Sequence, residues 1–157
     1  KNFDDFAEDM DRDFRRGLWY GIFSPTPVTP MSWWWEYFEN RGMMTYFKGV
    51  RQISDRMLAD GKGSFEQLTV ACNPAEAKCG KVVYVYLYNN SDKALQDAEL
   101  TVNLGCSGSY TIETFDPGTC VSATHGELPT PGRLVLGKIA LSPRAERIYV
   151  FTPKSAN

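Results

Sequence analysis

The hydrophobic period changes once along this chain of 157 residues, and this change limits the possible folds more than any other feature. Apolar side chains recur every three or four positions in residues 3–23 and again in 43–58, as on one face of an α-helix. After Ser64 the pattern becomes strand-like, and Lys81 to Tyr88 is dense in β-branched and aromatic residues. We therefore expect an α+β chain in which a helical segment precedes a sheet domain.

The first half predicts a helix, one strand and a second helix. Two prolines in the segment 24–27 end the first helix, because proline cannot continue it. Residues 28–35 then favour a strand, 36–42 a loop, and 60–64 a linker after the second helix. A strand with aromatic residues on both faces needs cover on both sides, as in parallel sheets flanked by helices. Residues 1–60 are therefore expected to be the tail of a larger α/β domain.

The second half predicts an antiparallel β-sandwich over residues 65–154. Six short strand-like runs are separated by turn residues, and these runs are 67–72, 81–88, 98–104, 109–115, 133–141 and 146–152. His125 is expected in an exposed loop, because it lies in a stretch rich in glycine and proline.

The four cysteines suggest disulfides rather than a metal site. They are Cys72, Cys79, Cys106 and Cys120; none forms a Cys-x-x-Cys pair, and the chain has one histidine. Cys72 and Cys79 flank a turn-like segment whose ends could reach bridging range, and Cys106 and Cys120 flank a strand-like run. The spacing leaves the connectivity open, and four free buried thiols are the alternative.

Composition argues against two classes of partner. The formal net charge of −2 gives no basic footprint for nucleic acid. No apolar run reaches the length of a membrane span, and the mean hydropathy of −0.35 is that of a soluble chain. The opening residues, from Lys1 on, do not have the pattern of a signal peptide, but a mature or truncated secreted product would also lack one.

The strongest candidate for a binding site is the segment from Met31 to Phe38, which contains three consecutive tryptophans. On a strand Trp33 and Trp35 would share one face and Trp34 would take the other. Indole rings can stack on the C–H faces of sugars, and the adjacent Glu36 can accept hydrogen bonds from hydroxyl groups. A buried aromatic cluster within a sheet is the alternative interpretation.

Two segments resemble the last barrel segment of cellulase-like and mannanase-like glycoside hydrolases. These are Gly17-Leu18-Trp19-Tyr20-Gly21-Ile22-Phe23-Ser24 and Val28-Thr29-Pro30-Met31-Ser32-Trp33-Trp34-Trp35-Glu36. In those (β/α)8 enzymes the eighth strand ends in a tryptophan-rich segment, and a final helix and a small β-sandwich follow. The sandwich match is looser and rests on residues 83–90 and 114–119.

The resemblance implies hydrolysis of β-linked polysaccharide by a retaining mechanism, without a cofactor or a metal. Its two catalytic glutamates, about 5 Å apart, would lie upstream of Lys1, so no catalytic residue is expected in this chain. Trp35 and Glu36, and secondly Trp33, would bind sugar at the end of the eighth strand, where barrel enzymes have their active sites.

The resemblance also implies partners and a location. The expected partners are a polysaccharide or oligosaccharide and the N-terminal part of the barrel, on the same or on a separate chain. The expected location is secreted, periplasmic or at the cell surface. A non-catalytic carbohydrate-binding or adhesion module is the alternative function, since the same tryptophans could stack on a glycan without hydrolysing it.

Overall fold

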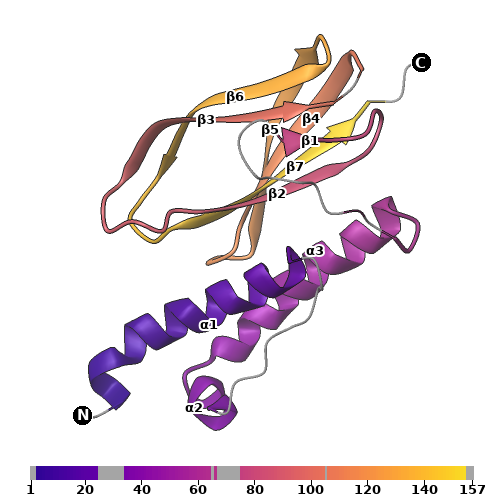
Figure 1. The fold of residues 1–157 in the computed structure, drawn as a ribbon. Helices are drawn as coiled ribbons and strands as arrows, with labels where there is room; N and C mark the ends of the chain where they lie inside the picture. The colour runs from indigo at the N-terminus through magenta and orange to yellow at the C-terminus, as the bar shows by residue number, and fades with distance from the viewer. Residues whose placement is uncertain (1–2, 25–33, 65, 67–74, 105, 155–157) are drawn as a thin grey trace. The chain divides into compact units, whose positions relative to one another are not determined.

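The chain is α+β in a computed structural model, which confirms the expected fold class (Figure 1). The structure describes residues 3–24, 34–64, 66, 75–104 and 106–154. It divides into two compact units: Lys1–Gln67 with Pro117–Cys120, and Leu68–Asp116 with Val121–Asn157. The first unit carries the helices and the second carries the strands.

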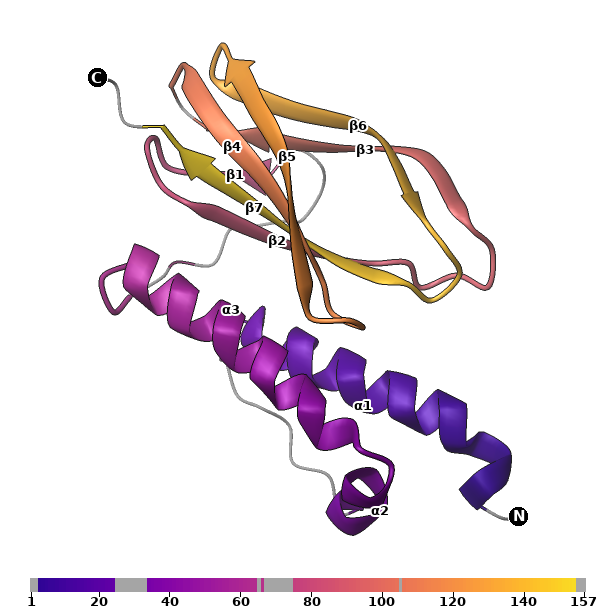
Figure 2. The ribbon, with the colours of Figure 1, turned by 180° about the vertical axis from the view of Figure 1, so that it is seen from behind.

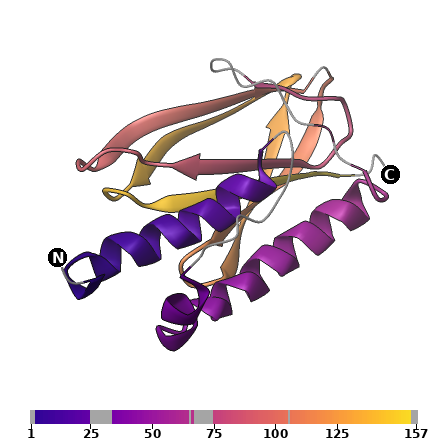
Figure 3. The same cartoon turned by 60° about the horizontal axis from the view of Figure 1, so that its bottom comes forward.

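The helical unit confirms both long helices that the 3.6-residue period predicts. Its elements are η1 (Phe3–Phe6), α1 (Ala7–Ile22), α2 (Trp35–Asn40), η2 (Met43–Thr45) and α3 (Tyr46–Asp60). Helices α1 and α3 lie side by side and run in the same direction, with α2 near the start of α3 (Figures 1 and 3).

Aromatic and aliphatic side chains join these helices. The ring of Phe14 on α1 stacks on that of Phe38 on α2, with centroids 4.3 Å apart, and meets Phe47 of α3 edge-on at 6.0 Å. Val50 and Ile53, one turn apart on α3, are buried. Part of each helix's apolar stripe is therefore buried within the unit, while Phe6, Phe47 and Leu58 of the stripes are exposed.

The first helix carries a run of acidic residues followed by arginines, and they form local ion pairs, as opposite charges three or four positions apart on a helix do. Arg12 pairs with Asp9 at 2.7 Å, and Arg16 pairs with Asp13 at 3.7 Å. These side chains are largely exposed, so each pair contributes little to stability.

The second unit is built from two sheets that face each other (Figures 1 and 2). One sheet has the order β1-β3-β6 and the other β2-β7-β4-β5. The strands are β1 (Ala75–Glu76), β2 (Val83–Tyr88), β3 (Leu95–Asn103), β4 (Gly108–Asp116), β5 (Val121–Thr130), β6 (Arg133–Leu141) and β7 (Glu146–Pro153). Every pairing is antiparallel except that of β1 with β3.

A single hydrophobic core lies between the two sheets. Val102 of β3 and Leu134 of β6 come from one sheet, and Ile112 of β4 and Phe151 of β7 come from the other. All four side chains are at least nine-tenths buried. Strand alternation brings them to the same side of their sheets, which is why the period-2 pattern of the sequence predicts the layer correctly.

The opposite face of the four-stranded sheet is also rich in aromatic residues. Tyr84 and Tyr86 lie on β2 opposite Val150 and Ile148 of β7, and all four alternate with the residues that face the core. The Tyr86 hydroxyl donates a 2.7 Å hydrogen bond to the carboxylate of Glu146, which is 8% exposed. Both faces of this sheet are therefore largely apolar.

Two strands were not predicted from the sequence. His125 lies within β5 and not in a loop, and its Nε2 is 2.7 Å from the Thr114 hydroxyl of β4. Strand β5 is an edge strand whose side chains are mostly exposed, so it lacks the apolar alternation by which strands are recognised. Strand β1 has two residues, too few to give a periodic signal.

The disulfide joins Cys79 to Cys106, with Cα atoms 5.4 Å apart. Cys120 takes part in no disulfide among the described residues, and Cys72 lies outside them. A pairing of Cys106 with Cys120 is excluded by length, because the nine-residue strand β4 between them extends about 30 Å, far beyond bridging distance.

Candidate functional site

The segment with the tryptophans is helical where the structure describes it, and the predicted strand ending at Trp35 is wrong at this end. Trp34 precedes helix α2 as its N-cap residue, and Trp35 and Glu36 form its first turn. The loop predicted for residues 36–42 is therefore wrong for Glu36 to Asn40, which are helical, whereas Arg41 and Gly42 form a turn. The expectation that Trp33 and Trp35 share one strand face is wrong as well, because Trp35 begins a helix; Trp33 itself lies outside the described residues, so its sugar-binding role stays a prediction.

Backbone hydrogen bonds and a glycine fix this short helix. The amide of Phe38 bonds the Trp34 carbonyl at 3.1 Å and closes the first turn. At the other end the amide of Gly42 bonds the Glu39 carbonyl at 2.9 Å. Gly42 has a φ of 72°, the left-handed conformation in which helices commonly terminate at glycine.

Helix α2 buries one ring and leaves the tryptophans in solvent. Phe38 is 4% exposed, whereas Trp34 is 51% and Trp35 58% exposed. The stacking of Phe38 on Phe14 of α1 holds the helix, so neither tryptophan is needed as its buried anchor. Trp34 and Trp35 therefore do not form the buried aromatic cluster within a sheet that was the alternative interpretation.

An ion pair holds the C-terminal end of α2 against α1. Arg41 Nε lies 2.9 Å from both carboxylate oxygens of Asp11, and the guanidinium lies over the ring of Tyr37 at 5.6 Å. The hydrogen bond that Arg41 donates to Asp11 is the main reason that the pKa of Arg41 is raised above its ordinary value. Asp11 thus differs from the other acidic residues of α1, because its partner, Arg41, lies thirty positions away in the sequence.

We call Trp34, Trp35 and Glu36 the tryptophan surface. Two indole rings on consecutive residues are more than half exposed, and Glu36, the next residue in the chain, is exposed as well. An indole face offers a flat, electron-rich apolar surface, and a carboxylate accepts hydrogen bonds. This combination can bind a ligand that presents C–H groups on one face and hydroxyl groups at its edge.

The buried carboxylate that the sequence did not reveal, Glu146, lies in the strand unit and is engaged by Tyr86. No group of three or more His, Cys, Asp or Glu residues in the described part of the chain could hold a metal ion. None of the helices in residues 3–24 and 34–64 is long and apolar enough to cross a lipid bilayer.

Comparison with known proteins adds no family to these observations. No protein-family model matches this sequence, and no curated protein matches it.

Proposed function

We propose that this chain is the C-terminal portion of a secreted glycoside hydrolase that acts on β-linked polysaccharide. In this proposal the catalytic glutamates lie upstream of Lys1, and this chain supplies aromatic sugar-binding residues. The observation that carries it is the tryptophan surface, with Trp34 and Trp35 both more than half exposed beside Glu36.

Exposure of these rings has a cost that binding would offset. Leaving an indole in water forgoes the hydrophobic stabilisation of burial, about 25 cal/mol for each Å² of apolar surface. Two exposed tryptophans next to each other in the sequence more often indicate a surface that contacts a partner than a defect in packing. A glycan fits better than a purely apolar partner, because the carboxylate of Glu36 would oppose an apolar cover.

The direction of the helices supports a barrel origin. Helices α1 and α3 run in the same direction (Figures 1 and 3). Consecutive helices of a β/α repeat run parallel to one another, because each one follows a strand of a parallel sheet. Phe6, Tyr20, Phe47 and Leu58 are also exposed in this unit, as expected of a segment that packs against further parts of a domain.

The disulfide supports the proposed location. A bond between Cys79 and Cys106 forms and persists in an oxidising compartment, such as the periplasm or the extracellular space.

The test of the tryptophan surface is a substitution of Trp35 by alanine. We expect this change to raise the dissociation constant for a β-1,4-linked glucan, mannan or xylan hexasaccharide by about 10- to 100-fold, by analogy with base stacking on aromatic rings at about 1–3 kcal/mol. Because Trp35 is 58% exposed, the thermal midpoint should change little. Isothermal titration calorimetry on the 157-residue chain and a thermal melt measure the two effects.

Tyr20→Ala is the matched control, since Tyr20 is 70% exposed on α1 and lies outside the surface. It should leave glycan affinity unchanged, and Trp35→Phe should lie between alanine and wild type. Unchanged affinity in Trp35→Ala, or an equal loss in Tyr20→Ala, would refute a sugar-binding role for Trp35.

A non-catalytic binding module is the second candidate, because the tryptophan surface alone would also suit it. The two differ in what a polypeptide does that joins this chain to the proposed upstream catalytic part. Release of reducing sugar by that polypeptide, with none released by the 157-residue chain alone, supports the hydrolase. Glycan binding without hydrolysis by both supports the module.

A further inference from the structure

A pocket of about 360 Å³ lies in the strand unit, far in sequence from the tryptophan surface. Its walls come from the start of β3, the end of β6, the start of β7 and the last residue of β4. Strands β3 and β6 belong to one sheet and β4 and β7 to the other, so the pocket lies between the ends of the two sheets. Its volume is within the range of small-ligand sites.

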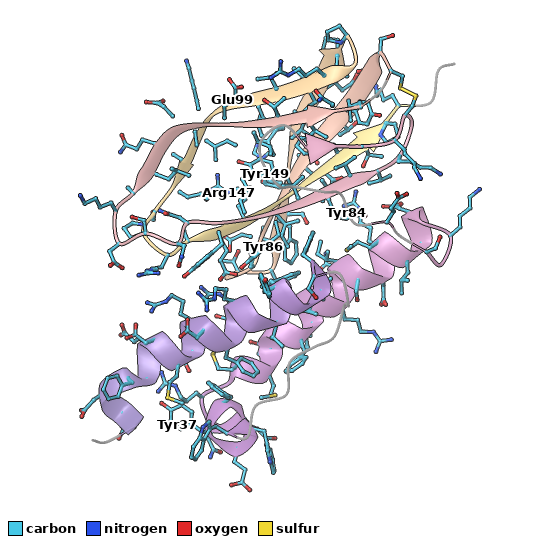
Figure 4. The ribbon with its side chains drawn as sticks, viewed as in Figure 1. Tyr37, Tyr84, Tyr86, Glu99, Arg147 and Tyr149 are labelled. Carbon is cyan, nitrogen blue, oxygen red and sulfur yellow. A yellow bond between two sulfur atoms is a disulfide. The ribbon has the colours of Figure 1, made fainter. Side chains whose placement is uncertain are left out.

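Arg147 is the residue that sets the chemistry of this pocket. It shares a face of β7 with Tyr149 and Phe151, so it lies on the core side of its sheet, in the space between the sheets (Figure 4). Among the described residues its side chain makes one hydrogen bond, a long one of 3.5 Å to the Ala140 carbonyl. A guanidinium has five N–H donors, so most of them remain available to a ligand.

The other lining residues complement Arg147. Asp116, Gln96 and Ser142 add exposed polar groups, while Leu95 and the buried Leu141 form an apolar wall. Donors and acceptors beside a small apolar wall suit a sugar ring, which presents hydroxyl groups at its edge and C–H groups on its faces.

The charges in the pocket select against ionic ligands. Arg147 carries one positive charge and Asp116 one negative charge, whereas the Glu146 carboxylate lies on the opposite face of β7, where Tyr86 donates to it. An anionic sugar would meet the carboxylate of Asp116, and a metal cation would lie beside a guanidinium. A neutral ligand avoids both repulsions.

Hydrogen bonds from Asn89 hold one wall of the pocket in place. Asn89 is 5% exposed, and its side-chain amide donates to the carbonyls of Leu141 at 3.3 Å and Ser142 at 2.9 Å. Nearby, Arg144 Nε donates to Asp92 at 2.9 Å and ties the same loop to the turn after β2. The wall is therefore preorganised, which lowers the entropic cost of binding.

We propose that this pocket is a second glycan-binding site, which takes the end of a neutral, hydroxylated sugar chain. Arg147 donates to ring hydroxyl groups, Asp116 accepts from them, and Leu95 and Leu141 contact a C–H face. The inference rests on the proposed function for its ligand class, but it uses none of the residues of the tryptophan surface.

The experiment is a nuclear magnetic resonance titration of the isotope-labelled 157-residue chain with neutral β-1,4-linked glucan, mannan and xylan hexasaccharides. At least one should shift the backbone amides of Gln96, Ser142 and Arg147 in a saturable way. Arg147→Ala should raise the dissociation constant measured at Gln96 and Ser142 by about tenfold or more, because bonds from a charged donor are lost. Arg147→Lys should recover only part of this, since it keeps the charge without the planar fork.

Three further variants guard against a folding defect. Ala94→Trp places a ring at the pocket and retains Arg147, so it should abolish the shifts at Gln96. Ala123→Trp on the exposed edge strand β5 introduces the same ring elsewhere in the sheet and should leave them intact. Arg133→Ala, a loss of an exposed arginine at the start of β6, should likewise bind as wild type does.

The outcomes separate this inference from the proposed function. If the indole signals of Trp34 and Trp35 respond while the pocket amides do not, the second site is refuted and the first stands. The reverse pattern supports the pocket and refutes the tryptophan surface. Tighter binding of an oligogalacturonate, or equal affinity in wild type and Arg147→Ala, overturns the neutral-sugar assignment of the pocket.

Discussion

Replacing Phe151 by alanine is expected to lower the free energy of unfolding of the β-sandwich by about 3–5 kcal/mol, as large aromatic truncations in cores do. Phe151 is fully buried and lies on β7, between Val83 of β2 and Ile112 of β4. Its ring is nearly parallel to that of Tyr149 in the same core. Removing it leaves a cavity at the centre of the four-stranded sheet, where neighbours on three strands cannot close in together.

Denaturant unfolding followed by the β-sheet circular dichroism signal measures this loss. All four tryptophans lie between residues 19 and 35, so their fluorescence reports the helical unit separately. Val121→Ala is the control, because Val121 is 61% exposed and should change the free energy by less than about 0.5 kcal/mol. A cost below about 1 kcal/mol for Phe151→Ala would contradict the assignment of this core.

Removing the disulfide is expected to have the second largest effect. Cys79 and Cys106 are 27 positions apart, and closing a loop of that length constrains the unfolded chain by about 3–4 kcal/mol. The double variant Cys79→Ala/Cys106→Ala should be less stable by that amount. Reductant should destabilise the wild type equally and should not affect the double variant.

Cys120→Ala is the control, since Cys120 takes part in no disulfide among the described residues and its loss should leave the sensitivity to reductant unchanged. Digestion without reductant followed by mass spectrometry should recover a peptide with Cys79 linked to Cys106. A peptide with Cys79 linked to Cys72 would show that the sequence spacing, and not the structure, indicates the correct partner.

Residues whose neighbours in sequence are also their neighbours in space were predicted well. Leu18 and Ile22 mark the buried side of α1, and β6 has the bounds that its alternation predicts, Arg133–Leu141. The hydrophobic period of such an element lies entirely within a short stretch of sequence, so the sequence alone is enough to recognise it.

The failures share a physical cause, which is that distant contacts override local preference. Three consecutive tryptophans favour a strand by propensity, yet Trp35 is helical because Phe38, three residues on, is buried against Phe14 of α1. Strand β5 pairs through its backbone with β4 and needs no apolar alternation. Leu95 and Arg147 line the same pocket although they are far apart in the sequence, and the disulfide joins two cysteines that are 27 positions apart. No local sequence pattern contains either pair.

The tryptophan surface is the central claim, and the indole N–H resonances of the labelled 157-residue chain test it most directly. Trp19 is fully buried and serves as an internal reference, whereas Trp34 and Trp35 are 51% and 58% exposed. During titration with the three neutral hexasaccharides, we expect the Trp34 and Trp35 signals to shift along one saturable curve while the Trp19 signal stays still. Unchanged Trp34 and Trp35 signals at saturating concentrations of all three glycans would contradict the account.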